Sequence, residues 1–207
     1  NMKWPHSPEG FKHTTLDWFG KCRVIALEIL RKILLVLDQN EDRLDKFFVE
    51  EDTSFLRLNH YPICDQPAST HKDYDGKGTL GIYDHTDAGA LTILIQSEIP
   101  GLQIKEQGTW KTIPANTDEL IVNTGDLLQI WSNDALPAPA HRVLANDQVG
   151  RYSAAFFLNP KYETHVKPLT AVTPKFRSVN WEEFRNQRSA GDYADLGEEI
   201  QIDHYRI

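Results

Sequence analysis

Cysteine is scarce in this chain of 207 residues, which contains only Cys22 and Cys64. Two thiols cannot build a disulfide framework, and neither of them belongs to a Cys-x-x-Cys pair. The sequence is therefore not that of a disulfide-held scaffold, and a reducing compartment suits it best. We expect both cysteines to be unpaired and partly buried.

Long apolar segments and basic segments are missing as well. The most apolar stretch, residues 33–37, has five residues, whereas a membrane helix needs roughly 20, and no signal peptide is visible at the start. The formal net charge is −8 at pH 7, and an acidic chain without a Lys/Arg-rich run is repelled by phosphate backbones. We therefore expect a soluble, cytoplasmic protein without a membrane or nucleic-acid partner. The oligomeric state has no signature in the sequence.

Apolar residues make up 40% of the chain, enough to bury a substantial core. Over residues 15–37 they recur at helical spacing, and from Ser54 to Tyr61 they alternate as in a strand. Asn180, with Glu183 three positions later, predicts the start of a second helix. Between these segments, frequent turn residues predict short strands at 81–87, 91–96, 102–105, 109–113, 120–123, 127–131, 141–144 and 151–158.

This order of elements predicts an α+β chain whose core is a β-sandwich or barrel. We divide it into an N-terminal helical support segment (1–52), a core (53–160) and a C-terminal helical extension (161–207), which together form a single domain. The stretch 65–78 reads as a surface loop because of its polar residues, proline and glycines.

One group of residues has the side chains needed to bind a metal ion. His85 and Asp87 are two positions apart, so in a strand their side chains point to the same face. Two histidines and one carboxylate are the ligand set of non-haem Fe(II) oxygenases, and His141, which opens a later strand, is the natural third ligand. A His-x-Asp dipeptide alone also fits a solvent-facing strand end. The other histidines are expected at the surface or in caps, namely His6, His13, His60, His71, His165 and His204.

Arg151 and Ser153 form a second pair that shares one strand face. A guanidinium is a planar fork suited to a carboxylate, and a hydroxyl adds one donor. An arginine inside a barrel is costly unless it meets an anion. The alternative is a structural salt bridge with one of the acidic residues of the chain.

Together these residues and their surroundings resemble the isopenicillin N synthase-like family of 2-oxoglutarate- and Fe(II)-dependent dioxygenases. The resemblance extends over roughly residues 54–160, and the ending GDYADLGEEIQIDHYRI is also similar. It rests on motifs that occur in the order and spacing of the family, namely LRLNHYP, HTDAGALTILIQ, GLQI, NTGDLLQIWSND, HRVLAN and RYSAAFFLNP.

The resemblance implies a double-stranded β-helix (jelly-roll) core flanked by helices. It implies Fe(II) on His85, Asp87 and His141, with 2-oxoglutarate chelating the metal. It further implies that Arg151 and Ser153 hold the far carboxylate of 2-oxoglutarate, and that Tyr61 adds a hydrogen bond. Dioxygen is then the second co-substrate, and ascorbate should support activity in vitro.

The chain departs from the family pattern in three places. His60 stands where tyrosine is commoner, but it alternates with Tyr61 and should face away from the site. The stretch ALPAPA (135–140) leads into His141, where relatives tend to have basic or aromatic residues, and it is expected to border the substrate. Family members usually carry about a hundred further residues before the segment that begins here with Trp4 and Pro5, so we expect the chain to lack an N-terminal part.

The resemblance implies oxidation of a small-molecule metabolite, as in secondary metabolism, by hydroxylation, desaturation or oxidative cyclisation, with release of succinate and carbon dioxide. Because Asp87 fills the position that a halide would need, halogenation is not expected. Three alternatives stay open: an Fe(II)/O2 oxidase of the same family that does not use 2-oxoglutarate, a non-catalytic jelly-roll binding protein, and a zinc hydrolase. No separate nucleophile or base supports the last of these.

Three further residues are candidates for binding the substrate. Tyr83 precedes His85 by two positions on the same strand face, Phe157 shares a face with Arg151 and Ser153, and Arg57 shares one with Tyr61. Arg57 is the candidate anchor for a substrate carboxylate. The competing interpretation is packing in the barrel, or for Arg57 a surface ion pair.

Overall fold

The computed structural model describes residues 3–49, 51–68, 78–169, 173–193 and 200–207. Most of the loop expected at 65–78, and part of the C-terminal ending, lie outside the described residues. Along the chain the elements are α1 (Phe11–Val36), a 3-10 helix (Asp45–Phe47), β1 (Phe55–Tyr61), β2 (Leu80–His85), β3 (Leu91–Gln96), β4 (Leu102–Glu106), β5 (Thr109–Thr112), β6 (Ile121–Thr124), α2 (Asp126–Trp131), β7 (His141–Leu144), β8 (Arg151–Leu158), β9 (His165–Val166), β10 (Val179–Asn180), α3 (Trp181–Tyr193) and a 3-10 helix (Ile202–Tyr205).

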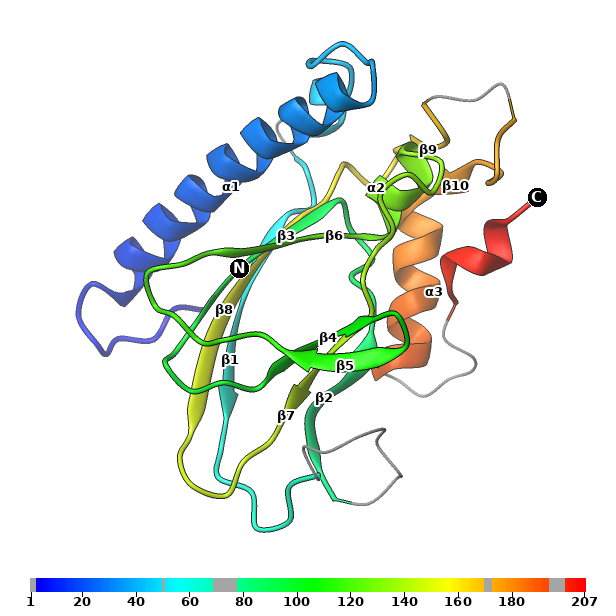
Figure 1. Cartoon of the computed structure of the whole chain (residues 1–207). Helices are drawn as coiled ribbons and strands as arrows, with labels where there is room; N and C mark the ends of the chain where they lie inside the picture. Colours follow the sequence, from blue (N-terminus) through cyan, green and yellow to red (C-terminus); the bar gives the residue numbers. More distant parts are fainter. Residues whose placement is uncertain (1–2, 50, 69–77, 170–172, 194–199) are drawn as a thin grey trace.

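Two four-stranded sheets form the core of the fold (Figure 1). The first sheet has the strand order β1-β8-β3-β6 and the second has the order β2-β7-β4-β5, and neighbouring strands pair antiparallel throughout. Strands that are distant in sequence, such as β1 and β8, are therefore direct neighbours. This arrangement confirms the predicted jelly-roll core flanked by helices.

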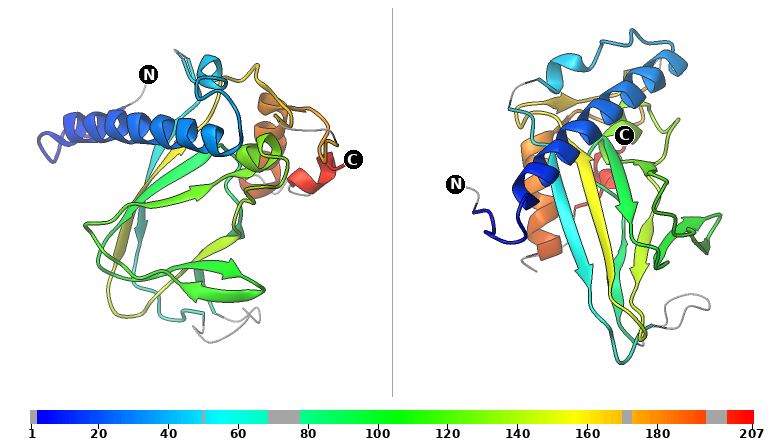
Figure 2. Two further views of the ribbon diagram at one scale, coloured as in Figure 1. Left: turned by 45° about the horizontal axis from the view of Figure 1, so that its top comes forward. Right: turned by 90° about the vertical axis from the view of Figure 1, so that its left-hand side faces the viewer.

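Helix α1 covers the outer face of the first sheet, as the right-hand view of Figure 2 shows. Its buried residues recur every four positions (Cys22, Ala26, Leu30 and Leu34), which places them along one side of the helix. On that side Phe19 meets Phe156 of β8 edge to face, with ring centroids 5.2 Å apart. The helix begins four residues earlier than predicted, at Phe11.

The segments that flank the core share its hydrophobic interior. Phe176, Val179 and Phe184 belong to the same buried cluster as Leu34 of α1 and Phe156 of β8. The described parts of the N- and C-terminal segments thus pack onto the sheets rather than forming separate cores.

Both cysteines are unpaired, as predicted, with Cys22 buried and Cys64 half-buried. Burial raises the pKa of the Cys22 thiol to about 11, because the thiolate is disfavoured away from water. Cys22 therefore acts as a small apolar residue on the buried side of α1.

The strand expected at 127–131 is wrong, because these residues lie in helix α2 (Asp126–Trp131). Leu127, Leu128, Ile130 and Trp131 are all buried. Buried positions at i, i+1, i+3 and i+4 follow the period of a helix, whereas a strand would alternate. The other predicted strands are present, with boundaries that match the prediction or differ by one or two residues.

Helix α3 begins at Trp181, close to the predicted start. The side-chain oxygen of Asn180 accepts a hydrogen bond of 3.0 Å from the backbone N–H of Glu183, which is the N-cap contact expected from the spacing. No helix among the described residues is long and apolar enough to cross a membrane.

Phe156→Ala should lower the free energy of unfolding by about 3–5 kcal/mol, since it leaves a cavity between the sheet and α1. Phe156 is fully buried, whereas Leu58 on neighbouring β1 is 50% exposed. Leu58→Ala is therefore the matched control and should cost less than about 1 kcal/mol. Urea unfolding of both variants measures the difference, and equal losses would contradict the packing described for α1.

Candidate metal centre

The pairing of β2 with β7 brings two histidines together. His85 and His141 are direct cross-strand partners in this antiparallel pair, and their ring centroids are 4.3 Å apart. Both imidazoles are half-buried. The second sheet thus places two of the three predicted ligands side by side at one end of the β2–β7 ladder.

Each imidazole is oriented by a carbonyl group two residues earlier in the chain. Nδ1 of His85 lies 2.8 Å from the carbonyl oxygen of Tyr83, and Nδ1 of His141 lies 3.1 Å from that of Pro139. A neutral imidazole that donates from Nδ1 carries its lone pair on Nε2. This arrangement of a ring nitrogen bonded to a carbonyl is typical of histidines that bind a metal through the other nitrogen.

Asp87 is held by residues of the first sheet. Its Oδ2 accepts hydrogen bonds from the Thr92 hydroxyl (2.6 Å) and from Nδ2 of Asn123 (2.8 Å). Its Oδ1 faces Nε2 of His85 at 3.8 Å and Nε2 of His141 at 3.6 Å. The carboxylate, only 7% exposed, therefore uses one oxygen for the protein and presents the other to the imidazoles.

These three groups fit a bound metal ion. One ligand atom from each of His85, Asp87 and His141 lies within 4.8 Å of the other two. The separations between Asp87 and the imidazoles are too long for hydrogen bonds, but they leave space between the donors for a cation. Two imidazoles and a carboxylate grouped on one side match the facial triad of non-haem Fe(II) sites.

The loop that follows Asp87 is packed tightly against the start of α2. Backbone N–H groups of Gly125, Asp126 and Leu127 donate to the carbonyl oxygens of Ala90, Asp87 and Gly89 at 2.8–3.0 Å. A Cβ atom on Gly125 would lie 2.8 Å from the Asp87 carbonyl oxygen and would also meet Gly89. Only glycine allows this approach, so the position of Asp87 depends on a close backbone contact.

Arg151 lies inside the barrel and is 1% exposed. Its Nη2 donates to Oε1 of Gln96 at 2.7 Å, and its Nε donates to the carbonyl oxygen of Ile99 at 3.2 Å. Nη1 is buried and has no hydrogen-bond partner among the described residues. Burial lowers the pKa of Arg151 from its usual value, and the Tyr61 hydroxyl acts in the opposite direction. A buried cation with an unused donor is suited to an incoming carboxylate.

Tyr61 and Ser153 lie close to this guanidinium. Tyr61 pairs with Arg151 across β1 and β8, and the Arg151 guanidinium lies over the Tyr61 ring at 4.9 Å. Ser153 accepts a hydrogen bond of 3.3 Å from Nδ2 of Asn59. All three residues predicted to hold 2-oxoglutarate line one cavity with His85, Asp87 and His141, the candidate ligands that form the metal triad.

That inner cavity lies between the two sheets and has a volume of about 230 Å³. Apart from the polar groups named above, its walls are mainly apolar and come from both sheets, with Ile82, Leu94, Leu102, Ile104, Ile113 and Val143 among the lining residues. An apolar wall around a few convergent polar groups is the usual design of a small-molecule site.

A second hollow, the outer groove, adjoins the inner cavity. It has a volume of about 610 Å³ and runs between the β1–β2 side of the barrel and α3. Arg57 and Phe157 line both spaces, whereas Tyr83, which is 59% exposed, lines only the outer groove. A register shift between Ile82 and His85 changes the alternation of β2, and Ile82 takes the inward position next to the histidines.

Two of the three departures from the family pattern, His60 and the ALPAPA stretch, have clear places in the structure. His60 is exposed and stacks on Tyr152 outside the barrel, with ring centroids 4.5 Å apart. It faces away from the site, as predicted. Pro139, from the ALPAPA stretch, lines the inner cavity.

Reasoning from the sequence missed the residues that support the site. Thr92 and Asn123 hold Asp87, and Gln96 holds Arg151. These contacts join residues that are distant along the chain or on different strands, so no local spacing in the sequence predicts them. The one available signal was polarity, because Thr92 and Gln96 interrupt an otherwise apolar buried strand.

A buried ion pair lies next to the metal triad. Asp126 of α2 is 1% exposed and Arg188 of α3 is 6% exposed. Burial raises the pKa of Asp126 to about 6, and the positive charge of Arg188 opposes this shift.

Comparison with known proteins supports the same assignment. The family model "2OG-Fe(II) oxygenase superfamily" matches residues 53–160. Gibberellin 2-beta-dioxygenase 8 of Arabidopsis thaliana is 35% identical over 155 residues, which are 73% of this chain and 43% of that protein. Jasmonate-induced oxygenase 2 of the same plant is 31% identical over 191 residues, 88% of this chain and 49% of that protein. The chain spans about half the length of these curated relatives.

Solved structures show the same fold. A full-length Neurospora crassa protein in complex with alpha-KG (2-oxoglutarate) superposes with a TM-score of 0.76 at 30% identity, over 90% of this chain and 60% of that one. JOX2 in complex with 2OG, Fe and JA superposes with a TM-score of 0.82 at 26% identity, over 99% of this chain and 59% of that one. Fe(II) and 2-oxoglutarate, expected as cofactors, are thus confirmed at the level of the family. The chain belongs to the 2OG-Fe(II) oxygenase superfamily.

Proposed function

We propose that this chain is the catalytic part of an Fe(II)- and 2-oxoglutarate-dependent dioxygenase of the isopenicillin N synthase-like type. It oxidises a small-molecule metabolite by hydroxylation, desaturation or oxidative cyclisation, with formation of succinate and carbon dioxide. One observation carries the proposal. The metal triad and the buried guanidinium of Arg151 open into the same small, largely apolar cavity.

In this proposal His85, Asp87 and His141 hold the iron on one side. Bound there, Fe(II) with 2-oxoglutarate and dioxygen supplies the oxidising power needed to break a C–H bond. Arg151 binds the far carboxylate of 2-oxoglutarate with its unused Nη1 donor. Ser153 and Tyr61 complete the polar end of the cavity.

The remaining walls of the cavity keep water away from the reacting groups. Most of the side chains from β3, β4 and β7 that line it are apolar. Exclusion of water strengthens the charge–charge contact between Arg151 and a carboxylate. It also protects a reactive centre from side reactions with solvent.

The outer groove is our candidate for the substrate site, because it adjoins the metal triad and Arg151 does not line it. His85 and Asp87 line both hollows. Phe55 and Phe157 stack in the groove with centroids 4.7 Å apart, and the Arg185 guanidinium lies 5.5 Å from the Phe55 ring. Aromatic faces beside arginines suit a small molecule with an apolar body and an acidic group. JOX2 and the Neurospora crassa protein, solved with JA and with thymine, support a small molecule as substrate.

The first experiment is spectroscopic. Adding Fe(II), 2-oxoglutarate and ascorbate anaerobically should produce the weak visible charge-transfer band of chelated 2-oxoglutarate. Asp87→Ala should abolish this band because a ligand is lost, and Arg151→Ala should weaken it because the far carboxylate loses its partner. Asp118→Ala, which changes an exposed carboxylate in a distant loop, should leave the band unchanged.

Other outcomes of that experiment have definite meanings. Iron binding without the band would favour the Fe(II)/O2 oxidase that does not use 2-oxoglutarate. Absence of iron binding would contradict the iron-dependent enzyme and leave the non-catalytic binding protein and the zinc hydrolase as candidates.

Thr92→Val tests whether the hydrogen bond to Asp87 serves the metal. The two side chains have nearly the same shape, but valine cannot donate to Oδ2 of Asp87. Fe(II) affinity should fall by about 10–100-fold, as is usual when a partner of a metal ligand is removed. Thr109→Val, on the exposed edge strand β5, is the control. An Fe(II) dissociation constant within about twofold of wild type for Thr92→Val would refute a supporting role.

Arg57→Ala tests the predicted substrate anchor. A substrate identified by succinate release should show a Michaelis constant raised by about tenfold or more, since a charged hydrogen bond contributes about 1.5–3 kcal/mol. The Michaelis constant for 2-oxoglutarate should stay the same, because Arg151 binds that carboxylate. Arg43→Ala, on the distant surface beside Gln39, serves as control. Unchanged substrate kinetics in Arg57→Ala would end the anchor hypothesis.

A further inference from the structure

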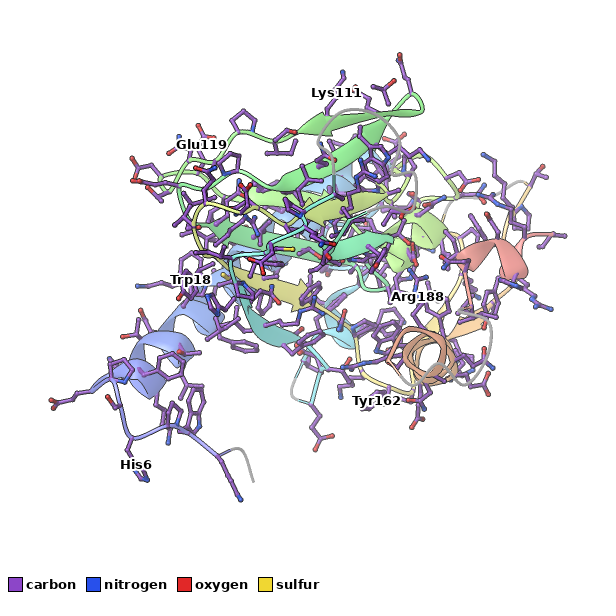
Figure 3. The ribbon with its side chains drawn as sticks, turned by 90° about the horizontal axis from the view of Figure 1, so that it is seen from below. His6, Trp18, Lys111, Glu119, Tyr162 and Arg188 are labelled. Atoms are coloured by element: carbon purple, nitrogen blue, oxygen red, sulfur yellow. The ribbon has the colours of Figure 1, made fainter. Side chains whose placement is uncertain are left out.

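Arg188 connects the C-terminal helix α3 to the metal centre. Figure 3 shows Arg188 on the side of α3 that faces the strands, and its side chain is only 7% exposed. Buried arginines are rare unless they are paired. The contacts of Arg188 therefore show which groups offset the energetic cost of burying its charge.

One arm of the guanidinium binds the residue between two predicted metal ligands. Nη2 of Arg188 donates to the carbonyl oxygen of Thr86 at 2.8 Å and to its hydroxyl oxygen at 3.0 Å. Thr86 lies between His85 and Asp87 in the chain. The backbone that joins these two ligands is thus held from α3, more than a hundred residues away in sequence.

The other arm reaches Asp126, which holds the same loop from α2. Nη1 of Arg188 lies 2.9 Å from Oδ2 of Asp126. The backbone N–H of Asp126 donates to the carbonyl oxygen of Asp87 at 2.8 Å. Consecutive carbonyl groups, those of Thr86 and Asp87, are therefore fixed by the two members of one buried ion pair.

We propose that Arg188 and Asp126 are positioning residues of the metal centre, which set the mutual orientation of His85 and Asp87. This inference rests on the proposed metal site. The pair acts through the peptide backbone on both sides of Asp87. Helix α3 is accordingly part of the metal centre as well as a cover for the barrel.

A purely stabilising role is the competing explanation, and the physics of buried ion pairs separates the two. Removing one partner leaves an uncompensated buried charge and destabilises a fold, whereas replacing both by apolar residues of similar size is often neutral or stabilising. Stability and metal binding should therefore respond differently to the double replacement.

The experiment compares wild type, Arg188→Met and the double variant Asp126→Leu with Arg188→Met. Urea unfolding of the metal-free proteins measures stability, and anaerobic titration with Fe(II), or with Co(II) as a spectroscopic probe, measures metal affinity. The single variant should lose stability. The double variant should regain most of that stability and still bind metal about 10–100-fold more weakly than wild type, the usual effect of losing the contacts that orient metal ligands.

Arg188→Lys provides a second variant in case the apolar pair does not fold. Lysine keeps the charge next to Asp126, but it is a single donor centre and cannot reproduce the fork that also reaches Thr86. Because the charge is kept, its stability should fall less than that of Arg188→Met, while metal affinity falls. The matched control replaces the Arg23–Asp52 pair, which joins α1 to the segment before β1 at 2.8 Å, with methionine and leucine. This control should leave metal affinity unchanged.

Wild-type metal affinity in a folded double variant or in Arg188→Lys would overturn the positioning role and leave the proposed function intact. Failure of the wild-type chain to bind Fe(II) or Co(II) would instead overturn the metal site and this inference with it.

Discussion

The antiparallel register of β2 with β7 is the constraint on which the site depends. It places His85 opposite His141, so two segments far apart in sequence present their imidazoles at one point. Side chains alternate along a strand, so a slip of one residue would turn one imidazole away from the other. Hydrogen bonds from Nδ1 to the carbonyls of Tyr83 and Pro139 then fix the remaining freedom of each ring. Backbone pairing sets the position, and side-chain hydrogen bonds set the orientation.

The barrel also shows how an apolar interior accommodates charge. In the described part of the chain three arginines are buried: Arg142, Arg151 and Arg188. Arg142 bonds Gln103 at 2.8 Å and lies over the Trp110 ring, while Arg188 pairs with Asp126. The hydrogen bonds of Arg151 go to neutral acceptors, Gln96 and the Ile99 carbonyl. Of the three, only Arg151 has a buried guanidinium nitrogen without a hydrogen-bond partner among the described residues, so its charge has most to gain from a bound anion.

Many of the strands and the His85–Asp87 pair could be predicted from local patterns, because these follow from short-range spacing, whereas the jelly-roll topology is predicted from the resemblance to a family, and the third candidate ligand, His141, lies far from the other two in sequence. Alternation predicts β1 and β8, and the i, i+2 spacing of His85 and Asp87 depends only on the geometry of a strand. A strand is wrongly predicted at 127–131, where the structure has helix α2, because a short apolar run near turn residues fits a buried strand as well as a short helix. Thr92, Gln96 and Arg188 act across strands and helices, and such tertiary contacts leave no periodic trace in one sequence.

The unused donor of Arg151 has a consequence for the thermodynamics of the whole chain. A buried polar group without a partner costs about 1–3 kcal/mol, and a dicarboxylate that occupies the cavity removes this cost in the folded state alone. Any ligand that binds only the folded state raises the melting temperature with its concentration. Under the proposed function, the thermal stability of this fold is therefore coupled, through one guanidinium nitrogen, to the supply of a central metabolic acid.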